Sequence, residues 1–103
     1  MKTFKTLELA IQFHEMTAQL VLTGHLRDQL SRASSSIALN LAEGNAKFSI
    51  KEKKRFYQTS YASLKECQTI FRLAKNTDQE IEKIADHLGA SLYKLLKSEI
   101  KQL

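Results

Sequence analysis

The sequence predicts an all-α protein, an antiparallel up-down-up-down four-helix bundle that forms one domain over residues 1–103. Three observations lead to this prediction. The chain contains no proline and only three glycines, the two residue types that most often interrupt helices. Apolar residues recur at three- and four-residue spacing along most of the chain. The breaks between these periodic segments are short, so consecutive helices must fold back on one another.

The first helix is expected over residues 3–22, where two apolar stripes are more than a helix with one buried face needs. One interpretation is a helix packed on several sides within the monomer; the other is an inner face beside a contact between subunits. Thr23-Gly24 is expected to end this helix, with glycine in the left-handed conformation. The stripes are Phe4, Leu7, Ile11 and Ala18, and Leu9, Phe13, Met16 and Leu20.

The second helix is expected over residues 25–43, closed by Gly44-Asn45. Small residues dominate its stretch from Ala33 to Ala42, and small side chains let a neighbouring helix approach closely. This stretch is therefore expected to form the tightest packing of the bundle.

Capping boxes, in which two side chains bond to free backbone amides, mark the starts of the last two helices. Ser49 and Glu52 open a third helix expected over 49–75. Thr77 and Glu80 open a fourth expected over 78–102. Gly89 lies inside this fourth helix, where close packing or a bend would explain it.

The composition favours a globular protein, with 43% hydrophobic residues, 26% charged residues and a formal net charge of +5. No stretch approaches the ~18–20 consecutive apolar residues of a membrane span, and no signal peptide is recognised. Cys67 is the single cysteine, so a disulfide framework is excluded. A reducing cytoplasm is the expected location.

Several segments of the expected second and third helices form a recognisable pattern: Gln29-Leu30, Arg32-Ala33, Ser36-Ile37, Asn40-Leu41-Ala42-Glu43-Gly44, Arg55-Phe56, Tyr61-Ala62-Ser63-Leu64 and Glu66. This pattern resembles that of the bacterial four-helix-bundle proteins encoded in intervening sequences of 23S ribosomal RNA genes (S23-like). Two positions depart from the usual family pattern: Ala38 replaces a proline, which predicts a straighter helix, and Leu41 replaces an isoleucine.

The resemblance implies a homopentamer of such bundles. It also implies distant kinship with the accessory protein of diversity-generating retroelements, which assists a reverse transcriptase on its RNA. The partners expected on this basis are further copies of the chain, RNA or DNA, and a reverse transcriptase or another protein.

The segment from Lys47 to Arg55 is the clearest charged feature, with five bases and one acid, Glu52. Most of these bases lie in the first turns of the third helix, where the helix dipole disfavours cations by roughly 0.3–1 kcal/mol each. A bound phosphate would relieve that repulsion, and Phe48, Phe56 and Tyr57 could stack on unpaired bases. The predicted nucleic-acid-binding residues are Lys47, Lys51, Lys53, Lys54 and Arg55.

Two alternatives for this segment stay open. The bases could bind an acidic protein, or they could form a solvated surface with the aromatic side chains in the core.

A polar stripe runs along one face of the second helix. Arg32 and Glu43 are too far apart to pair, so they are expected to reach other helices or subunits, and Glu66 is expected to share the network. The main interpretation is a layer that fixes helix register. The alternative is a paired-carboxylate acid/base site made by Glu43 and Glu66. The residues of this predicted polar layer are Arg32, Ser36, Asn40, Glu43 and Glu66.

No enzyme, metal or cofactor signature is found. No histidine follows a glutamate by three residues, as a ferritin-like site requires. Cys67 lies on an apolar row and is expected to be an inert core residue. The leading hypothesis is a non-enzymatic, homo-oligomeric, nucleic-acid-associated accessory protein; the alternative is a protein-binding scaffold.

Overall fold

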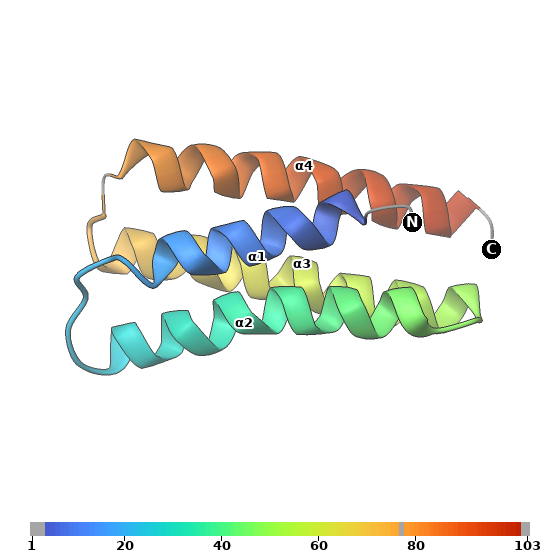
Figure 1. Cartoon of the computed structure of the whole chain (residues 1–103), viewed down its shortest axis with the longest axis horizontal. Coiled ribbons are helices and arrows are strands. Elements are labelled where there is room, and N and C mark those ends of the chain that lie inside the picture. Colours follow the sequence, from blue (N-terminus) through green and yellow to red (C-terminus); the bar gives the residue numbers. More distant parts are fainter. Residues whose placement is uncertain (1–3, 77, 102–103) are drawn as a thin grey trace.

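The computed structural model describes residues 4–76 and 78–101, with side chains up to residue 98. These residues form helices and connections and contain no strand, so the all-α prediction is confirmed. The helices extend along one axis of a body measuring 41 × 23 × 22 Å (Figure 1). They are α1 (Lys5–Thr17), α2 (Gly24–Ala46), α3 (Ile50–Leu73) and α4 (Gln79–Lys101).

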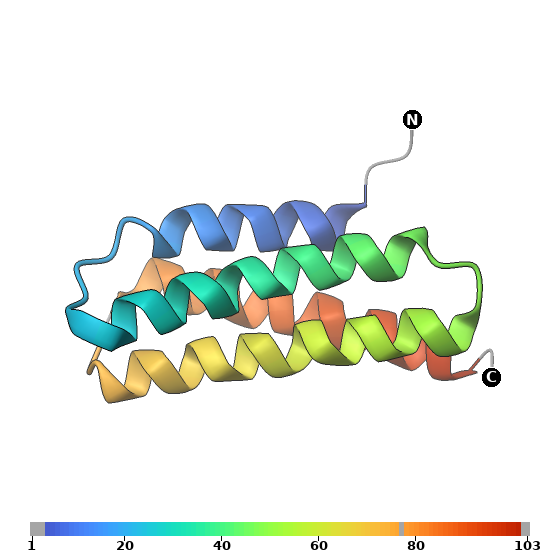
Figure 2. The same ribbon diagram turned by 90° about the horizontal axis from the view of Figure 1, so that it is seen from below.

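Each helix packs against two others. α1 and α3 both contact α2 and α4. In Figure 1 α1 lies in front of α3, and in Figure 2 the two helices lie at opposite edges of the body. Successive helices run in opposite directions along the long axis (Figure 1). As a result, the α2–α3 turn lies at one end, while the α1–α2 and α3–α4 connections lie at the other.

The core lies along the axis between the four helices. Phe13 and Phe71 meet edge to face, with ring centroids 6.1 Å apart. The largest fully buried side chains are Tyr57, Phe13, Ile37, Leu41, Leu64, Leu88 and Leu92.

The buried line of α1 contains only one residue of the two apolar stripes, Phe13. That line is Thr6, Ala10, Phe13 and Thr17, whose small or polar members give little hydrophobic signal. Most stripe residues pack partly buried against the core, because α1 lies between α2 and α4. Ile11 is the most exposed of the large apolar side chains in these stripes, at 40%.

The prediction that α1 extends to residue 22 and ends at Thr23-Gly24 is wrong. The helix ends at Thr17, whose hydroxyl donates to the backbone oxygen of His14 at 2.8 Å. Leu20 and Leu22 then pack against the core from the connection, so their apolar spacing does not require a helix. Gly24 does adopt the left-handed conformation (φ 60°), but as the first residue of α2.

The prediction that Gly44-Asn45 closes the second helix is also wrong, because α2 continues to Ala46. Gly44 is buried inside the helix, where a β-carbon would lie 2.7 Å from Cε1 of Tyr57. A glycine is therefore needed at position 44 because α3 packs closely against it, and not because the helix ends there.

Local bonds explain where the last two helices begin and end. The Ser49 hydroxyl accepts the Glu52 amide at 3.1 Å, which confirms the cap of α3. At the start of α4, the Asp78 carboxylate accepts the Ile81 amide at 3.1 Å; the predicted partner Thr77 lies outside the described residues. α3 ends at Leu73, two residues before the prediction, because Lys75 turns the chain with φ 55°.

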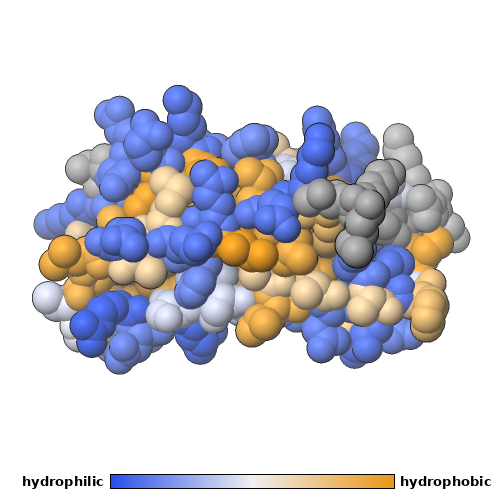
Figure 3. Space-filling model, viewed as in Figure 1, coloured by the Kyte–Doolittle hydropathy of each residue, from blue (hydrophilic) through white to orange (hydrophobic). Residues whose placement is uncertain are grey.

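Apolar side chains on the surface gather in a band between two hydrophilic margins in Figure 3. In the part of the chain that the structure describes, no helix combines the length and apolar character that a membrane crossing requires.

Candidate nucleic-acid interface

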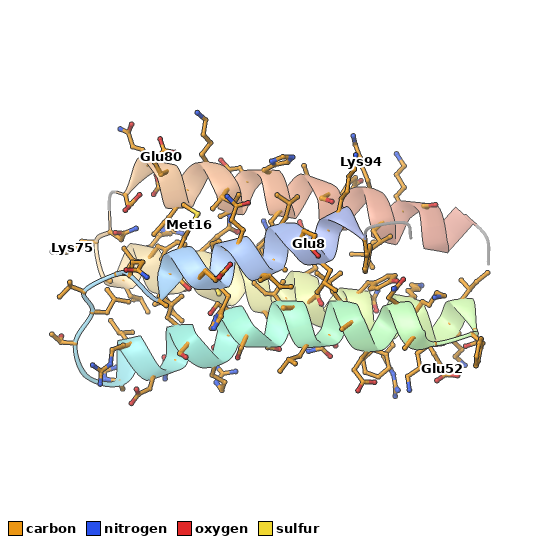
Figure 4. All side chains as sticks on the ribbon, viewed as in Figure 1. Glu8, Met16, Glu52, Lys75, Glu80 and Lys94 are labelled. Carbon is orange, nitrogen blue, oxygen red and sulfur yellow. The ribbon has the colours of Figure 1, made fainter. Side chains whose placement is uncertain are left out.

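The α2–α3 turn brings the basic segment to one end of the bundle. Residues 47–49 separate the two helices, so the bases on both sides of the turn lie close together. Figure 4 shows the contrast along the molecule: Glu52 lies near this end, whereas Glu80 marks the opposite end. The acidic first half of α4 therefore lies far from the basic start of α3.

Two of the five predicted bases are engaged in structural contacts. Lys53 Nζ donates to the backbone oxygens of Gly44 at 3.4 Å and Asn45 at 3.2 Å, at the carboxyl end of α2. The Gly44 oxygen also accepts the Lys47 amide at 3.1 Å. Lys47 Nζ lies 3.7 Å from a carboxylate oxygen of Glu43 and 5.3 Å from the ring centroid of Phe56. These contacts favour roles at the helix junction for both lysines.

The other three bases line a shallow depression on α3. Lys51, Lys54 and Arg55 share it with Glu52 and Gln58. Among the described residues, none of the three bases forms an ion pair. Their positive charges therefore face solvent in a small area, beside the single carboxylate of Glu52.

The aromatic residues of the segment have three different environments. Phe48 is fully exposed, and Phe56 is half-buried with Arg55 5.0 Å from its ring centroid. Tyr57 is 2% exposed and belongs to the core. The prediction that Tyr57 is available for stacking on nucleic-acid bases is therefore wrong.

The predicted polar layer links α2 to α3. Arg32 of α2 forms an ion pair with Glu66 of α3, in agreement with the prediction that Arg32 reaches another helix. Ser36 and Ser63 hydroxyls lie 2.9 Å apart. Asn40 Nδ2 donates back to the Ser36 backbone oxygen at 2.9 Å and to its hydroxyl at 3.1 Å.

Glu43 does not join this layer, because its carboxylate pairs with Lys47 near the end of its own helix. Glu66 pairs with Arg32 instead. The two carboxylates thus have separate cationic partners, and their contacts give no support to a paired acid/base site.

Cys67 is buried in the core. Burial raises the pKa of the thiol from 9.0 to about 12; nearby Glu66 adds to the rise and Arg32 opposes it. Because the thiolate is the nucleophile and the metal ligand, this environment suppresses both reactions near neutral pH. Over the described part of the chain, no three His, Cys, Asp or Glu side chains gather as metal ligands.

A second depression lies between α3 and α4 and adjoins the first through Gln58. Its other lining residues are Tyr61, Tyr93, Leu96 and Lys97. Tyr93 and Lys97 give no distinct signal in the sequence, because they lie among the leucines of an amphipathic helix. Only the packing of α4 on α3 places them beside Tyr61.

Comparison with known families supports the resemblance noted in the sequence. The family model described as 23S rRNA-intervening sequence protein matches residues 3–101. No match to a curated protein was found. Because the match covers almost the whole chain, this protein belongs to the 23S rRNA-intervening sequence protein family.

Proposed function

We propose that this chain is a non-enzymatic, homo-oligomeric accessory protein that binds nucleic-acid phosphates at the α2–α3 end of the bundle. The observation that carries the proposal is the cluster of Lys51, Lys54 and Arg55, three bases without an ion pair among the described residues. The net charge of +5 acts in the same direction over longer distances. The family's name, which refers to ribosomal RNA, favours RNA as the ligand.

The position of these bases supports an anionic ligand. They lie in the first two turns of α3, where the helix dipole disfavours cations. Lys53 escapes this cost because its ammonium reaches the carbonyl end of α2. A phosphate beside Lys51, Lys54 and Arg55 would offset their mutual repulsion.

The test replaces Lys51, Lys54 and Arg55 together by alanine and leaves Lys53 in place, because Lys53 stabilises the helix junction. Binding of labelled RNA and DNA is measured by fluorescence anisotropy over a range of salt concentrations. The unmodified chain is expected to bind at low salt. The triple variant is expected to bind much more weakly, with a log–log salt slope about 2–3 smaller.

The matched control replaces Arg27, Arg72 and Lys83 by alanine. These three exposed bases lie near the start of α2, the end of α3 and the start of α4, away from the α2–α3 turn. This variant removes the same net charge and is expected to retain most of the binding. Circular dichroism checks that both variants fold. If the unmodified chain binds neither RNA nor DNA at low salt, the proposed function is wrong.

Self-association is the second part of the proposal. Ile11 and Leu39 are 40% and 65% exposed, and Phe48 is fully exposed, so large apolar side chains stay open on the monomer. A contact between copies would cover such side chains. We expect the pentamer that the resemblance implies; sedimentation at micromolar concentration showing only monomers would contradict this part.

The alternative function is a protein-binding scaffold, and the same exposed apolar residues favour it. It would be supported by a defined protein partner that stays bound after nuclease treatment. Kinship with the retroelement accessory protein, association with a reverse transcriptase and a cytoplasmic location stay predictions.

A further inference from the structure

We propose that the groove between α3 and α4 binds an unpaired nucleic-acid strand, with Tyr61 and Tyr93 stacking on its bases. This inference rests on the proposed function and names both the form of the nucleic acid and its path. The strand would start at the basic depression of Lys51, Lys54 and Arg55 and continue into the tyrosine-lined depression.

The two depressions form one continuous surface, because Gln58 lines both of them. Along α3, the residues Lys51, Lys54, Gln58, Tyr61 and Lys65 follow alternating spacings of three and four. Residues at this spacing lie on one face of a helix. From Lys51 to Lys65 the face extends about 21 Å, which matches about six nucleotides of a stacked strand.

The charge of this surface suits a polyanion. The lining residues of the two depressions include four bases, Lys51, Lys54, Arg55 and Lys97, and one acid, Glu52. Lys65 adds another cation, with Nζ 5.1 Å from the ring centroid of Tyr61. Charge complementarity therefore favours nucleic acid over a second copy of this basic chain as the occupant.

The tyrosines favour an unpaired strand over a duplex. Tyr93 is 58% exposed and Tyr61 is half-buried, so both rings are accessible beside the groove. Aromatic side chains stack on splayed bases, and they do so with little dependence on sequence. In a duplex the bases are already stacked on one another, so the tyrosines would add little to its binding.

Phe48 is the contrasting aromatic residue. It is fully exposed but lies in the α2–α3 turn, and it does not line either depression. It therefore provides a matched control for losing an exposed ring outside the groove.

The experiment measures fluorescence anisotropy with three labelled probes: a single-stranded RNA of about 12 nucleotides, the same sequence as DNA, and the RNA duplex. Replacing both Tyr61 and Tyr93 by leucine is expected to weaken binding of each single strand at least about tenfold. Duplex binding, which depends on phosphates, is expected to change less than about twofold. A Tyr61→Phe, Tyr93→Phe variant should retain the affinity. Phe48→Ala, which removes an exposed ring outside the groove, should weaken single-strand binding less than the leucine variant does.

The chain's own fluorescence gives a second readout. The chain contains no tryptophan and three tyrosines, of which Tyr57 is buried. Stacking in the groove is expected to quench the emission of Tyr61 and Tyr93 when a single strand binds, and the duplex is expected to quench it less.

The outcomes separate this inference from the proposed function. Failure of every probe to bind at low salt would overturn both. Binding that needs Lys51, Lys54 and Arg55 but is unchanged in the leucine variant would overturn the groove alone. A leucine variant that sediments as a smaller oligomer while keeping its affinity would show that the groove holds a second copy, which also overturns the inference.

Discussion

α3 packs against α2 on one side and α4 on the other, and the two sides are built differently. The α2 side is close and polar: Ser36 meets Ser63, Ser60 bonds to the Ile37 backbone, and Gly44 lies against Tyr57. The α4 side is apolar inside, and its outer edge is open as the groove of Tyr61 and Tyr93.

The difference shows how one small bundle can separate stability from binding. Directional hydrogen bonds and close steric contacts fix the position of α3 on α2. Apolar packing is less directional, and it holds α4 while leaving a groove at the surface. We therefore expect substitutions on the α2 side to alter stability strongly and substitutions at the groove to alter binding.

The largest expected effect is a loss of unfolding free energy at alkaline pH. It tests whether the buried Cys67 thiol is shielded from water. Burial raises the pKa of Cys67 to about 12, so the unfolded chain loses this proton at lower pH than the folded chain. The resulting stabilisation is complete below about pH 9 and is lost as pH rises toward 12. The loss is on the order of 3 kcal/mol by pH 11.

Urea unfolding between pH 8 and 11 measures this effect. Cys67→Ala lacks the thiol and controls for the titration of lysines and tyrosines. If both chains lose stability in parallel over this range, Cys67 is in contact with water.

Gly44→Ala should have the next largest effect. The added β-carbon would lie 2.7 Å from Cε1 of the buried Tyr57 and 3.0 Å from Cβ of Phe56. The resulting shift of α2 from α3 is expected to lower the free energy of unfolding by about 2 kcal/mol, despite alanine's better helix propensity. Thermal and urea unfolding measure the change, and an equally stable variant would contradict the close approach of these helices.

Ser60→Ala removes a buried bond across the same pair of helices. Its hydroxyl donates to the Ile37 backbone oxygen at 2.9 Å, and both residues are buried. Loss of this bond is expected to cost about 1 kcal/mol of unfolding free energy. Thr59→Ala, at the neighbouring exposed position, is the control for urea unfolding and should change stability by less.

Gly89→Ala should give the smallest effect, with the opposite sign. Here the added β-carbon would meet Cδ2 of Leu64 at 3.4 Å, which is an ordinary contact. Better helix propensity is then expected to raise the unfolding free energy by about 0.5–1 kcal/mol. The same unfolding measurements test it. If Gly89→Ala lowers the free energy of unfolding as much as Gly44→Ala does, α4 packs as closely on α3 as α2 does, and the proposed difference between the two sides of α3 is wrong.

The helices themselves were predictable because their signals are local. Spacing of apolar residues predicted all four helices, and the Ser49 cap placed the start of α3 correctly. The pairing of Arg32 with Glu66 was only partly predictable from the sequence. Glu66 has no basic residue three or four positions away on α3, but Asp28 lies four residues before Arg32 on α2.

The end of α1 and the role of Gly44 were not predictable from local pattern. Leu20 and Leu22 continue the apolar spacing, but they contact the core from a connection. A glycine near the end of a helix is typical of a terminal turn, whereas Gly44 leaves space for Tyr57.

The sequence by itself determined the helical segments, the Ser49 cap of α3 and the number of bases in the 47–55 segment, because each depends on residues within a few positions of one another. The tertiary structure decided that Lys53 is bound to carbonyl oxygens while Lys51 lines an open depression. It also decided that Tyr93 of α4 lies beside Tyr61 of α3. Such neighbours are set by how whole helices pack on one another, and helical periodicity in one segment does not specify its partner.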